Sequence, residues 1–451
     1  MIALIGRSLR QPVLVSPAPP RAGRSLPVAG AAAGFLRDPT GFLKRARAEH
    51  GDTFLLQAFG FQLLFVFSPA GVRALYQLPE GVASFEAATR TLIGFKLPDE
   101  LLAGDMSMFH RLFGRSSTDA YLGHLRSAMQ EELTELGPSG ELEIFSRMKR
   151  LVHRLAFRCW AGREAASPRY FSRLVRLFEA LDPEEAFVRP GRTLITVLTK
   201  KVPERRALAE VESVLDEIWR ERRRAGRTEG DMLETLHETH ASLPPDERKK
   251  RVARDVMILH LASQSNLYAA LSWTLINLLV RPHLRDVVRA GDIETLDRCA
   301  YESIRVAQRS ITLRKVVAEA TLDDGNTVYH LQPGVFVATM LSVNNGAFAS
   351  LDRFDPAHYD GGRLAKSVTL PTPEVVSTFG HGPHACPGRR FAIAAIRVAV
   401  TELFDALELE PLFTQPAPHP TQIGAVARAD RPCIVAYRAK RAAESVGGAG
   451  I

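Results

Sequence analysis

The sequence predicts a mainly α-helical protein with a small β region, and three observations support that fold class. Arg251–Val280 contains neither Gly nor Pro, and thirty consecutive helical residues would span about 45 Å. Residues 121–226 divide into successive helical segments. Only short stretches are as rich in aromatic and aliphatic residues as strands usually are. Two of them, Thr53–Ala58 and Gln62–Phe67, flank a turn at Gly60 and predict a hairpin.

Local signals of the same kind predict the remaining elements. Helical patterns predict helices at Pro39–His50, Ser68 to about Leu78, Arg205–Arg224 and Phe391–Leu407. Strand patterns predict a strand within 309–317, a pair formed by Asn326–His330 and Gly334–Met340, and a closing strand at Pro432–Arg438. Residues 84–120 are less periodic, and 225–250 predict a charged surface connection with one short helix.

Length and charge narrow the class of protein. The 451 residues are 46% hydrophobic, which is enough for a large core, and no second compositional regime is visible. The net charge of +8 is spread over short clusters such as Lys249–Arg251. Because no basic stripe is interleaved with aromatic residues, nucleic-acid binding is not expected. Most of these charges are expected on solvated helix faces.

The cysteines and the N-terminus bear on the compartment. The four cysteines show no paired spacing, so neither a disulfide framework nor a zinc site is expected, and a reducing compartment fits better. Residues 1–15 are interrupted by Arg7, Arg10 and Pro12 and are too short for a membrane span of about 20 residues. We therefore expect a cytoplasmic protein without a transmembrane anchor, with weak peripheral attachment through Ile2–Val15 as the alternative.

The stretch Phe379–Gly388 carries the strongest chemical signal. It reads Phe-Gly-His-Gly-Pro-His-Ala-Cys-Pro-Gly and places Cys386 just before an apolar helical run. A helix N-terminus lowers the pKa of a nearby thiol and so favours the thiolate, the form that binds metals. Gly380, Gly382 and Gly388 allow sharp turns and the close approach of a flat ligand. Pro387 suits the first position of the helix.

The pattern Phe-x-x-Gly-x-His-x-Cys-x-Gly closely resembles the haem-binding loop of cytochromes P450. The resemblance implies haem b bound by Cys386 as the axial ligand of the iron, and a thiolate that assists O–O cleavage. It places His384 where a haem propionate is often bound and Phe379 where an aromatic ring packs near the thiolate. The implied fold is that of the family, with haem between the long helix Arg251–Val280 and the Cys386 loop.

A second match to this family lies some 80 residues before the loop. Glu302 and Arg305 are three residues apart on a predicted helix, so their side chains share one face and can form an ion pair. They match the family's Glu-x-x-Arg, and His358 falls in the position of its third partner. These three residues are expected to be structural. The same comparison places Arg314 where the family has a propionate-binding arginine.

The long helix departs from the family pattern at its centre. Where the family usually has an acid followed by an alcohol, the segment Ala262-Ser263-Gln264-Ser265-Asn266 offers Ser265 and Asn266. The pattern resembles the branch that contains sterol 7α-hydroxylases and prostacyclin synthase. We expect Ala262, Ser265 and Asn266 to form the catalytic face. An asparagine donates hydrogen bonds but does not relay protons easily, which leaves the reaction type open. Helix–helix hydrogen bonding is the plain alternative for this polar cluster.

The resemblance covers roughly residues 26–440, preceded by an irregular lead-in at 1–25 and followed by a tail at 441–451. It implies a monooxygenase that acts on a lipophilic small molecule such as a sterol, terpene, fatty acid or polyketide. Its electrons would come from a separate ferredoxin-type or flavodoxin-type donor with its reductase, docked near Arg389 and Arg390. A reductant-independent isomerase or peroxygenase acting on a lipid peroxide is the alternative. We expect a monomer. In the family, the region that corresponds to 84–120 is normally followed by a helix with a Trp or His and an Arg that meet the haem. Tyr121, His124 and Arg126 are the candidates here, and none has the usual spacing.

Overall fold

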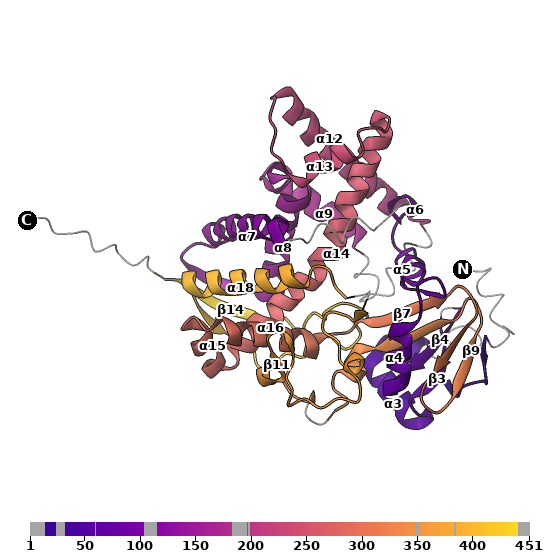
Figure 1. Ribbon diagram of the computed structural model, residues 1–451. Coiled ribbons are helices and arrows are strands. Elements are labelled where there is room, and N and C mark those ends of the chain that lie inside the picture. The colour runs from indigo at the N-terminus through magenta and orange to yellow at the C-terminus, as the bar shows by residue number, and fades with distance from the viewer. Residues whose placement is uncertain are drawn as a thin grey trace, which may run out of the picture.

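The computed structural model describes residues 14–23, 32–58, 60–102, 115–182, 196, 199–348, 351–382 and 385–440. In Figure 1 a helical body lies beside a β-rich region, and a lobe of helices projects from the body. The prediction of a mainly α-helical protein with a small β region is therefore confirmed.

The helical body and its lobe contain most of the buried apolar side chains in one continuous cluster. Their helices are α7 (Arg115–Leu136), α8 (Ile144–Trp160), α9 (Phe171–Leu181), α12 (Val202–Arg224), α13 (Met232–Thr239), α14 (Pro245–Leu279), α15 (Pro282–Arg289), α16 (Ile293–Ala307) and α18 (Arg389–Ala406). The smaller helices are α2 (Ala32–Arg37), α3 (Pro39–His50), α4 (Pro69–Gln77), α5 (Phe85–Ile93), α6 (Asp99–Leu102) and α17 (Leu341–Asn344).

Helix α14 runs through the centre of the molecule and packs against α8, α16 and α18 (Figure 1). It has 35 residues and begins six residues earlier than the sequence analysis expected, at Pro245. The earlier start is possible because proline is tolerated in the first turn, where its missing N–H would have no helical partner. The charged connection 225–250 thus contains one short helix, α13, and the first turns of α14.

The lobe consists of α9, α12 and α13, and a buried arginine holds it to the body. Arg222 on α12 donates hydrogen bonds to Glu164 at 3.0 Å and to Asp231 at 2.9 Å. Asp231 is also the N-cap of α13, where its side chain accepts from the N–H of Glu234. Because Arg222 is only 1% exposed, the loss of either carboxylate would leave a buried charge poorly paired.

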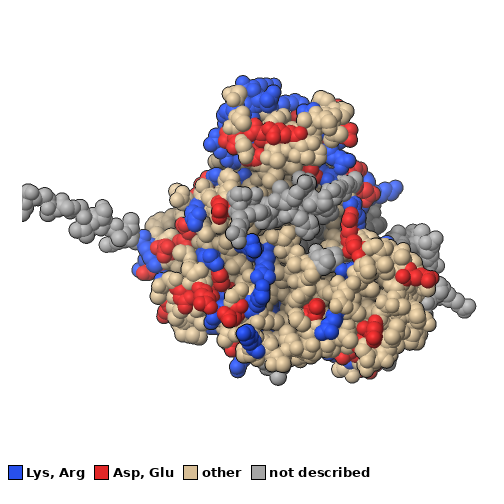
Figure 2. Space-filling model, in the orientation of Figure 1, with Lys and Arg blue, Asp and Glu red and all other residues tan. Residues whose placement is uncertain are grey.

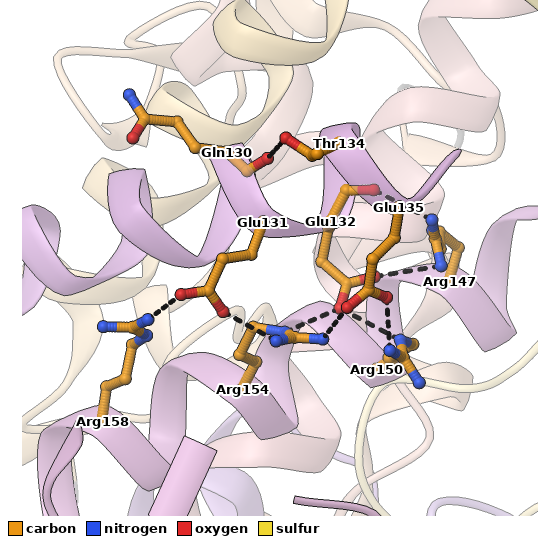
Figure 3. A network of polar contacts seen from close by, with 9 residues as sticks. All are labelled: Gln130, Glu131, Glu132, Thr134, Glu135, Arg147, Arg150, Arg154 and Arg158. Carbon is orange, nitrogen blue, oxygen red and sulfur yellow. Dashed lines mark hydrogen bonds and ion pairs between the residues drawn. The ribbon is translucent and has the colours of Figure 1, made fainter. Parts of the chain in front are cut away.

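A second ion-pair network joins α7 to α8 (Figure 3). Three glutamates of α7 meet four arginines of α8: Glu131, Glu132 and Glu135 with Arg147, Arg150, Arg154 and Arg158. Arg154 lies at its centre, donating to Glu132 at 2.8 Å and to Glu131 at 2.7 Å. This network fixes the outer face of α8.

The β-rich region centres on a six-stranded sheet in the order β2-β3-β4-β10-β7-β5. Its strands are β2 (Arg21–Ala22), β3 (Thr53–Ala58), β4 (Phe61–Val66), β5 (Ala83–Ser84), β7 (Ile311–Val316) and β10 (Phe336–Met340). Strands β3 and β4 form the predicted hairpin, with Thr53 opposite Val66. Strand β10 lies parallel to β4 and antiparallel to β7.

The predicted pairing of Asn326–His330 with Gly334–Met340 is wrong, although both stretches contain a strand. Strand β9 (Val328–Leu331) lies in a separate sheet between β1 (Val15–Ser16) and β8 (Ala320–Asp323), whereas β10 is central in the six-stranded sheet. The chain changes sheets at Gly334, whose φ of 104° is easily reached by glycine alone. Alternating burial along β9 and complete burial of β10 suit these two environments.

Two smaller sheets complete the fold. Strand β14 (Ile434–Ala439) pairs with β13 (Leu407–Pro411) and with β6 (Ser139–Glu143), so the predicted closing strand is confirmed. Strands β11 (Tyr359–Asp360) and β12 (Arg363–Leu364) form a short two-stranded sheet. The C-terminal sheet thereby ties the end of the chain to the start of α8.

The surface is mixed in charge. Basic side chains gather at the outer end of the lobe, and acidic side chains gather over α15 and α16 (Figure 2). Among the residues that the structure describes, none of the helices combines the length and apolar character that a membrane span requires.

Candidate active site

Cys386 lies in a tightly closed loop immediately before α18. Its backbone N–H donates to the carbonyl of Phe379 at 2.7 Å, and the N–H of Ala385 donates to the carbonyl of Gly382 at 3.1 Å. Gly380 and Gly382 have φ values of 78° and 58°, the left-handed region that favours glycine. Gly388 has a φ of −80°, so its backbone conformation is open to any residue, and a turn does not require glycine there.

Cys386 differs from the other cysteines in its exposure. All four cysteines are free, and Cys386 is exposed whereas Cys159, Cys299 and Cys433 are buried. The protein packed around the loop raises the pKa of the Cys386 thiol, and backbone N–H groups of Gly388 and Arg389 oppose that rise. The helix terminus therefore acts in the expected direction, but the expectation of a lowered pKa is wrong, because desolvation is the larger effect.

The start of α18 also differs from expectation. The helix begins at Arg389 with Gly388 as its N-cap, so Pro387 precedes the cap rather than occupying the first helical position. The N–H groups of Gly388 and Arg389 thus lie at the helix terminus and donate toward the sulfur. This geometry favours a thiolate once a cation is available to bind it.

Glu302, Arg305 and His358 lie together beneath the loop, deep in the protein. Glu302 and Arg305 form a bidentate ion pair at 2.6 and 2.7 Å, and Nδ1 of His358 lies 2.9 Å from Oε1 of Glu302. Arg305 also donates to the carbonyls of Leu351 and Arg353 at 2.9 Å. Glu302 is fully buried. The triad therefore joins α16 to the segment that leads toward the Cys386 loop.

Phe379 and Arg389 connect the loop to the same helix. The ring of Phe379 meets the ring of Tyr301 edge to face, with centroids 5.7 Å apart. Nε of Arg389 donates to the hydroxyl of Tyr301 at 3.2 Å. Tyr301 is on α16, next to Glu302, so one helix supports both ends of the loop.

The three residues of α14 that are expected to be catalytic do not all lie on one face of the helix. Ala262 and Asn266 are exposed and lie one turn apart on the same face, whereas Ser265 is 5% exposed. Neighbouring residues on a helix point about 100° apart, so Ser265 lies on a more buried face of α14 than Ala262 and Asn266. The catalytic part of all three residues stays a prediction.

Asn266 is held in one orientation by a loop near the C-terminus. Its Oδ1 accepts a hydrogen bond from the backbone N–H of Val426 at 3.0 Å. A backbone N–H can only donate, so the amide oxygen must face Val426 and the NH₂ group must point elsewhere. The preceding residue, Ala425, has a φ of 55°, which is uncommon for a residue other than glycine. Local patterns do not pair these two residues, because 160 residues of sequence separate them.

Arg314 lies on β7 and is 2% exposed. Its guanidinium donates to the carbonyls of Leu78 and Ala83, the latter at 3.0 Å. Burial lowers the pKa of Arg314. His384, the other residue expected at a propionate, lies outside the described residues.

Sequence reasoning missed a contact next to Arg314. The hydroxyl of Tyr76 lies 2.9 Å from Oγ1 of Thr312, and the ring of Tyr76 meets that of His381 edge to face at 5.2 Å. His381 belongs to the Cys386 loop, so these contacts join α4 and β7 to it. No local pattern around Tyr76 could have indicated this, because its partners are more than two hundred residues away.

Helix α14 and the start of α18 approach each other beside the loop. Ser263, Leu267 and Phe391 border one small cavity together with Trp160. Ser263 is three residues before Asn266, and Phe391 is five residues after Cys386. Residues close in sequence to Asn266 and to Cys386 therefore lie side by side.

A helical fold with an accessible thiol at a helix terminus, an internal Glu–Arg–His triad and a long central helix defines a haem-thiolate oxidoreductase. The family model of cytochrome P450 matches residues 129–435. This chain belongs to the cytochrome P450 family.

Curated relatives are similar over most of their length. Sterol 14-demethylase of Arabidopsis thaliana is 24% identical over 422 residues, which cover 85% of this chain and 84% of that protein. Human 24-hydroxycholesterol 7-alpha-hydroxylase is 21% identical, with 92% of each chain covered. Among solved structures, the retinoic acid-bound cyanobacterial CYP120A1 has a TM-score of 0.71 at 19% identity and covers 94% of this chain and 100% of that chain. The last likeness supports the fold alone.

The cofactor of the family is haem b, and the residues present fit it. A soft thiolate such as that of Cys386 is a suitable ligand for haem iron. The loop supplies that sulfur in accessible form. The protein is accordingly a haem-dependent oxidoreductase, and its relatives include proteins named as monooxygenases.

Proposed function

We propose that this protein is a monooxygenase that inserts one oxygen atom of O₂ into a C–H or C=C bond of a lipophilic small molecule. The second oxygen atom leaves as water, which takes up two electrons and two protons. The observation that carries the proposal is the exposed Cys386 before α18, together with the exposed Ala262–Asn266 face of α14, whose neighbour Ser263 borders a small cavity with Phe391 of α18. Relatives named as sterol demethylases and a hydroxycholesterol hydroxylase support a substrate of the sterol, terpene, fatty acid or polyketide type.

Each site residue has a distinct part in this proposal. When bound, haem would supply the activation of O₂, and Cys386 would hold its iron through the thiolate. Arg314 and His384 bind the propionates, Phe379 packs beside the thiolate, and Gly380 and Gly388 let the backbone come close to the flat ring. The buried triad Glu302, Arg305 and His358 keeps the loop in place and takes no part in the chemistry.

Asn266 acts as a fixed hydrogen-bond donor in this proposal. Its oxygen is bound by Val426 at 3.0 Å, so its NH₂ group is left to donate to an oxygen atom of the substrate or reactant. An amide neither gains nor loses a proton near neutral pH, so proton delivery falls to water. Ala262 leaves room on the same face.

The same observation favours a second candidate function. An enzyme that rearranges a lipid peroxide needs a donor that orients the peroxide, and it needs no proton relay and no reductant. A fixed asparagine in place of an acid and alcohol pair suits that chemistry. The two functions differ in whether electrons must be supplied.

The monooxygenase would receive its electrons from a separate donor of the ferredoxin or flavodoxin type, which is reduced by its own reductase. The enzyme itself would be a monomer. Arg389 and Arg390 at the start of α18 are exposed and basic, so an acidic partner would be attracted to the end of the helix that follows the axial ligand. The acidic side chains over α15 and α16 (Figure 2) would repel such a partner and restrict its docking.

The test is turnover of the haem-loaded protein on a panel of sterols, fatty acids, terpenes and lipid hydroperoxides. Each compound is incubated with and without a surrogate ferredoxin, its reductase and NADPH. Oxygen insertion that requires the reductant supports the monooxygenase. Conversion of hydroperoxides at the same rate without reductant overturns it in favour of the peroxide-rearranging enzyme.

A further inference from the structure

A cleft of about 480 Å³ opens between α8, α9 and α14, a size that suits a small organic ligand. It is separate from the site described above. The α14 residue that lines it is Tyr268, which follows His260 and Gln264 at intervals of four residues. Gln264 is two residues from both Ala262 and Asn266, which is a rotation of about 200°. The cleft therefore lies on the opposite face of α14 from the exposed Ala262–Asn266 face.

The mouth of the cleft is rich in positive charge. Four cationic side chains line it, and the only carboxylate among the described lining residues is Glu179. The cations are Lys149 and Arg150 on α8, Arg176 on α9, and Arg428. Nζ of Lys149 lies 2.7 Å from Oε1 of Glu179, and Arg150 pairs with Glu132 and Glu135 of α7, so these charges are partly compensated. The remaining positive charge at the mouth, to which Arg176 contributes, would attract an anion.

The arginines at the mouth are held in place by their surroundings. The guanidinium of Arg150 lies 5.1 Å from the centre of the Phe171 ring and donates to Glu132 at 3.1 Å, within the network of Figure 3. Nε of Arg428 donates to the hydroxyl of Tyr268 at 2.8 Å. Preorganised side chains lose little entropy when a ligand binds.

The walls of the cleft are apolar. Phe145 on α8 and Phe171 and Val175 on α9 contribute to them. A ligand that places an anionic group among the cations would therefore lay its carbon skeleton against aromatic and aliphatic surface. Inorganic anions could not use that surface.

One member of a buried histidine pair lines the cleft. His153 lines the cleft and is 1% exposed. Its Nδ1 lies 2.8 Å from Nε2 of His260, which is fully buried against Phe157 and Phe178. Among the described residues, no hydrogen-bond partner is found for Nε2 of His153 or for Nδ1 of His260. Buried polar atoms are usually satisfied, so a polar group is expected beside His153.

The two histidines share one hydrogen between their rings, which couples their outer nitrogens. If Nε2 of His260 donates, Nε2 of His153 carries a hydrogen, and in the reverse arrangement it is an acceptor. An anionic ligand that reaches His153 selects the arrangement in which His153 donates.

We propose that the cleft between α8, α9 and α14 is a second ligand site that binds an amphipathic organic anion. The anionic group lies among Lys149, Arg176 and Arg428, the apolar body lies on Phe145, Phe171 and Val175, and His153 donates to the ligand from the cleft floor. A carboxylate and a phosphate monoester share this chemistry. The proposal does not depend on the reaction catalysed at the haem.

The test is calorimetric titration of the haem-loaded protein after the haem side has been saturated with an azole inhibitor. The probes are octanoate, octyl phosphate, octanol and inorganic phosphate. We expect octanoate or octyl phosphate to bind with one ligand per chain, and the tighter of the two identifies the anionic group. Octanol and inorganic phosphate should bind at least tenfold more weakly. Failure of both amphipathic anions to bind, or equal binding of octanol or inorganic phosphate, would overturn the proposal.

Three variants locate the ligand. Val175→Trp fills the cleft and should abolish binding, Arg176→Glu reverses an exposed charge at its mouth and should weaken binding at least fivefold, and His153→Phe keeps the ring but removes its nitrogens and should also weaken it. Arg363→Glu makes the same charge change on β12, away from the cleft, and should bind as the wild type does. Binding that is unchanged in Val175→Trp and His153→Phe, with thermal midpoints near that of the wild type, would contradict the site.

Discussion

The backbone N–H of Val426 donates to Oδ1 of Asn266 at 3.0 Å, across 160 residues of sequence. The contact converts a side chain that could turn either way into a donor of fixed direction. It also makes the turn at Ala425, with its φ of 55°, part of the proposed active site. The chemistry assigned to Asn266 therefore depends on a loop near the C-terminus as well as on α14.

Asn266→Asp separates these two properties. An aspartate can still accept from Val426, but its carboxylate has no N–H to donate at neutral pH. A hydrogen bond to a charged group is worth about 1.5–3 kcal/mol, so we expect product formed per electron supplied to fall by about 10-fold or more. Ser265→Ala is the matched control, because that side chain lies on a buried face, and its coupling should stay near that of the wild type. Equal coupling in both variants would remove Asn266 from the mechanism.

Cys386→Ala should abolish the visible absorption spectrum of thiolate-ligated haem. The reason is that Cys386 is exposed and receives hydrogen bonds from the N–H groups of Gly388 and Arg389. Burial raises the pKa of both Cys299 and Cys433 to about 12 and keeps those thiols protonated. The measurement is the spectrum of the reduced protein with carbon monoxide. Cys299→Ala should retain the spectrum of thiolate-ligated haem. If Cys386→Ala also retained that spectrum, another residue would have to bind the iron.

Glu302→Gln should destabilise the protein strongly. The substitution leaves the buried guanidinium of Arg305 without its carboxylate, and breaking a buried pair costs about 3–5 kcal/mol. Urea unfolding followed by circular dichroism measures the loss, and haem content should fall with it. Glu294→Gln removes an exposed ion pair with Arg298 on the same helix and should cost less than about 1 kcal/mol. Similar losses in the two variants would contradict the structural role of the triad.

Gly162→Ala should loosen the attachment of the lobe. Gly162 has a φ of 88°, and an added Cβ would lie 2.0 Å from Nη2 of Arg222. Backbone strain alone costs about 1–3 kcal/mol, and displacement of Arg222 adds to it. Gly291→Ala is the control, since its φ is 95° but its surroundings are open. Thermal unfolding should show a larger loss of stability for Gly162→Ala than for Gly291→Ala. Equal losses of stability would mean that Arg222 can move aside without an energetic cost.

Acidification should weaken the fold before most carboxylates are protonated. Burial lowers the pKa of His153 from 6.5 to about 3, helped by the charge of Lys149, and burial also lowers the pKa of His260. A histidine with a lowered pKa binds fewer protons in the folded state than in the unfolded state, so stability is full above pH 6.5 and is lost progressively toward pH 3. The thermal midpoint should fall across that range, and His153→Phe should fall less steeply. A wild-type midpoint that is constant from pH 6.5 to 4.5 would refute this.

Local patterns were sufficient for the parts of the molecule that consist of neighbouring residues. The sequence predicted the Cys386 loop, the hairpin of β3 and β4, and the shared helix face of Glu302 and Arg305. Each depends on turn residues, alternation or helical spacing, which act over a few positions. The start of α14 was misplaced only because proline is tolerated at a helix N-terminus. These features were enough to indicate the fold class and to propose the thiolate ligand.

Other features depended on which elements meet in space. The sequence could not indicate that β9 and β10 enter different sheets, because two adjacent strands joined by a short turn carry the same local pattern in either case. Nor could it separate Ser265 from Asn266, since the packing around α14 determines which face is buried. The contacts of Asn266 with Val426 and of His153 with His260 join residues more than one hundred positions apart. Such contacts are selected by the packing of whole helices and sheets, so only the tertiary structure reveals them.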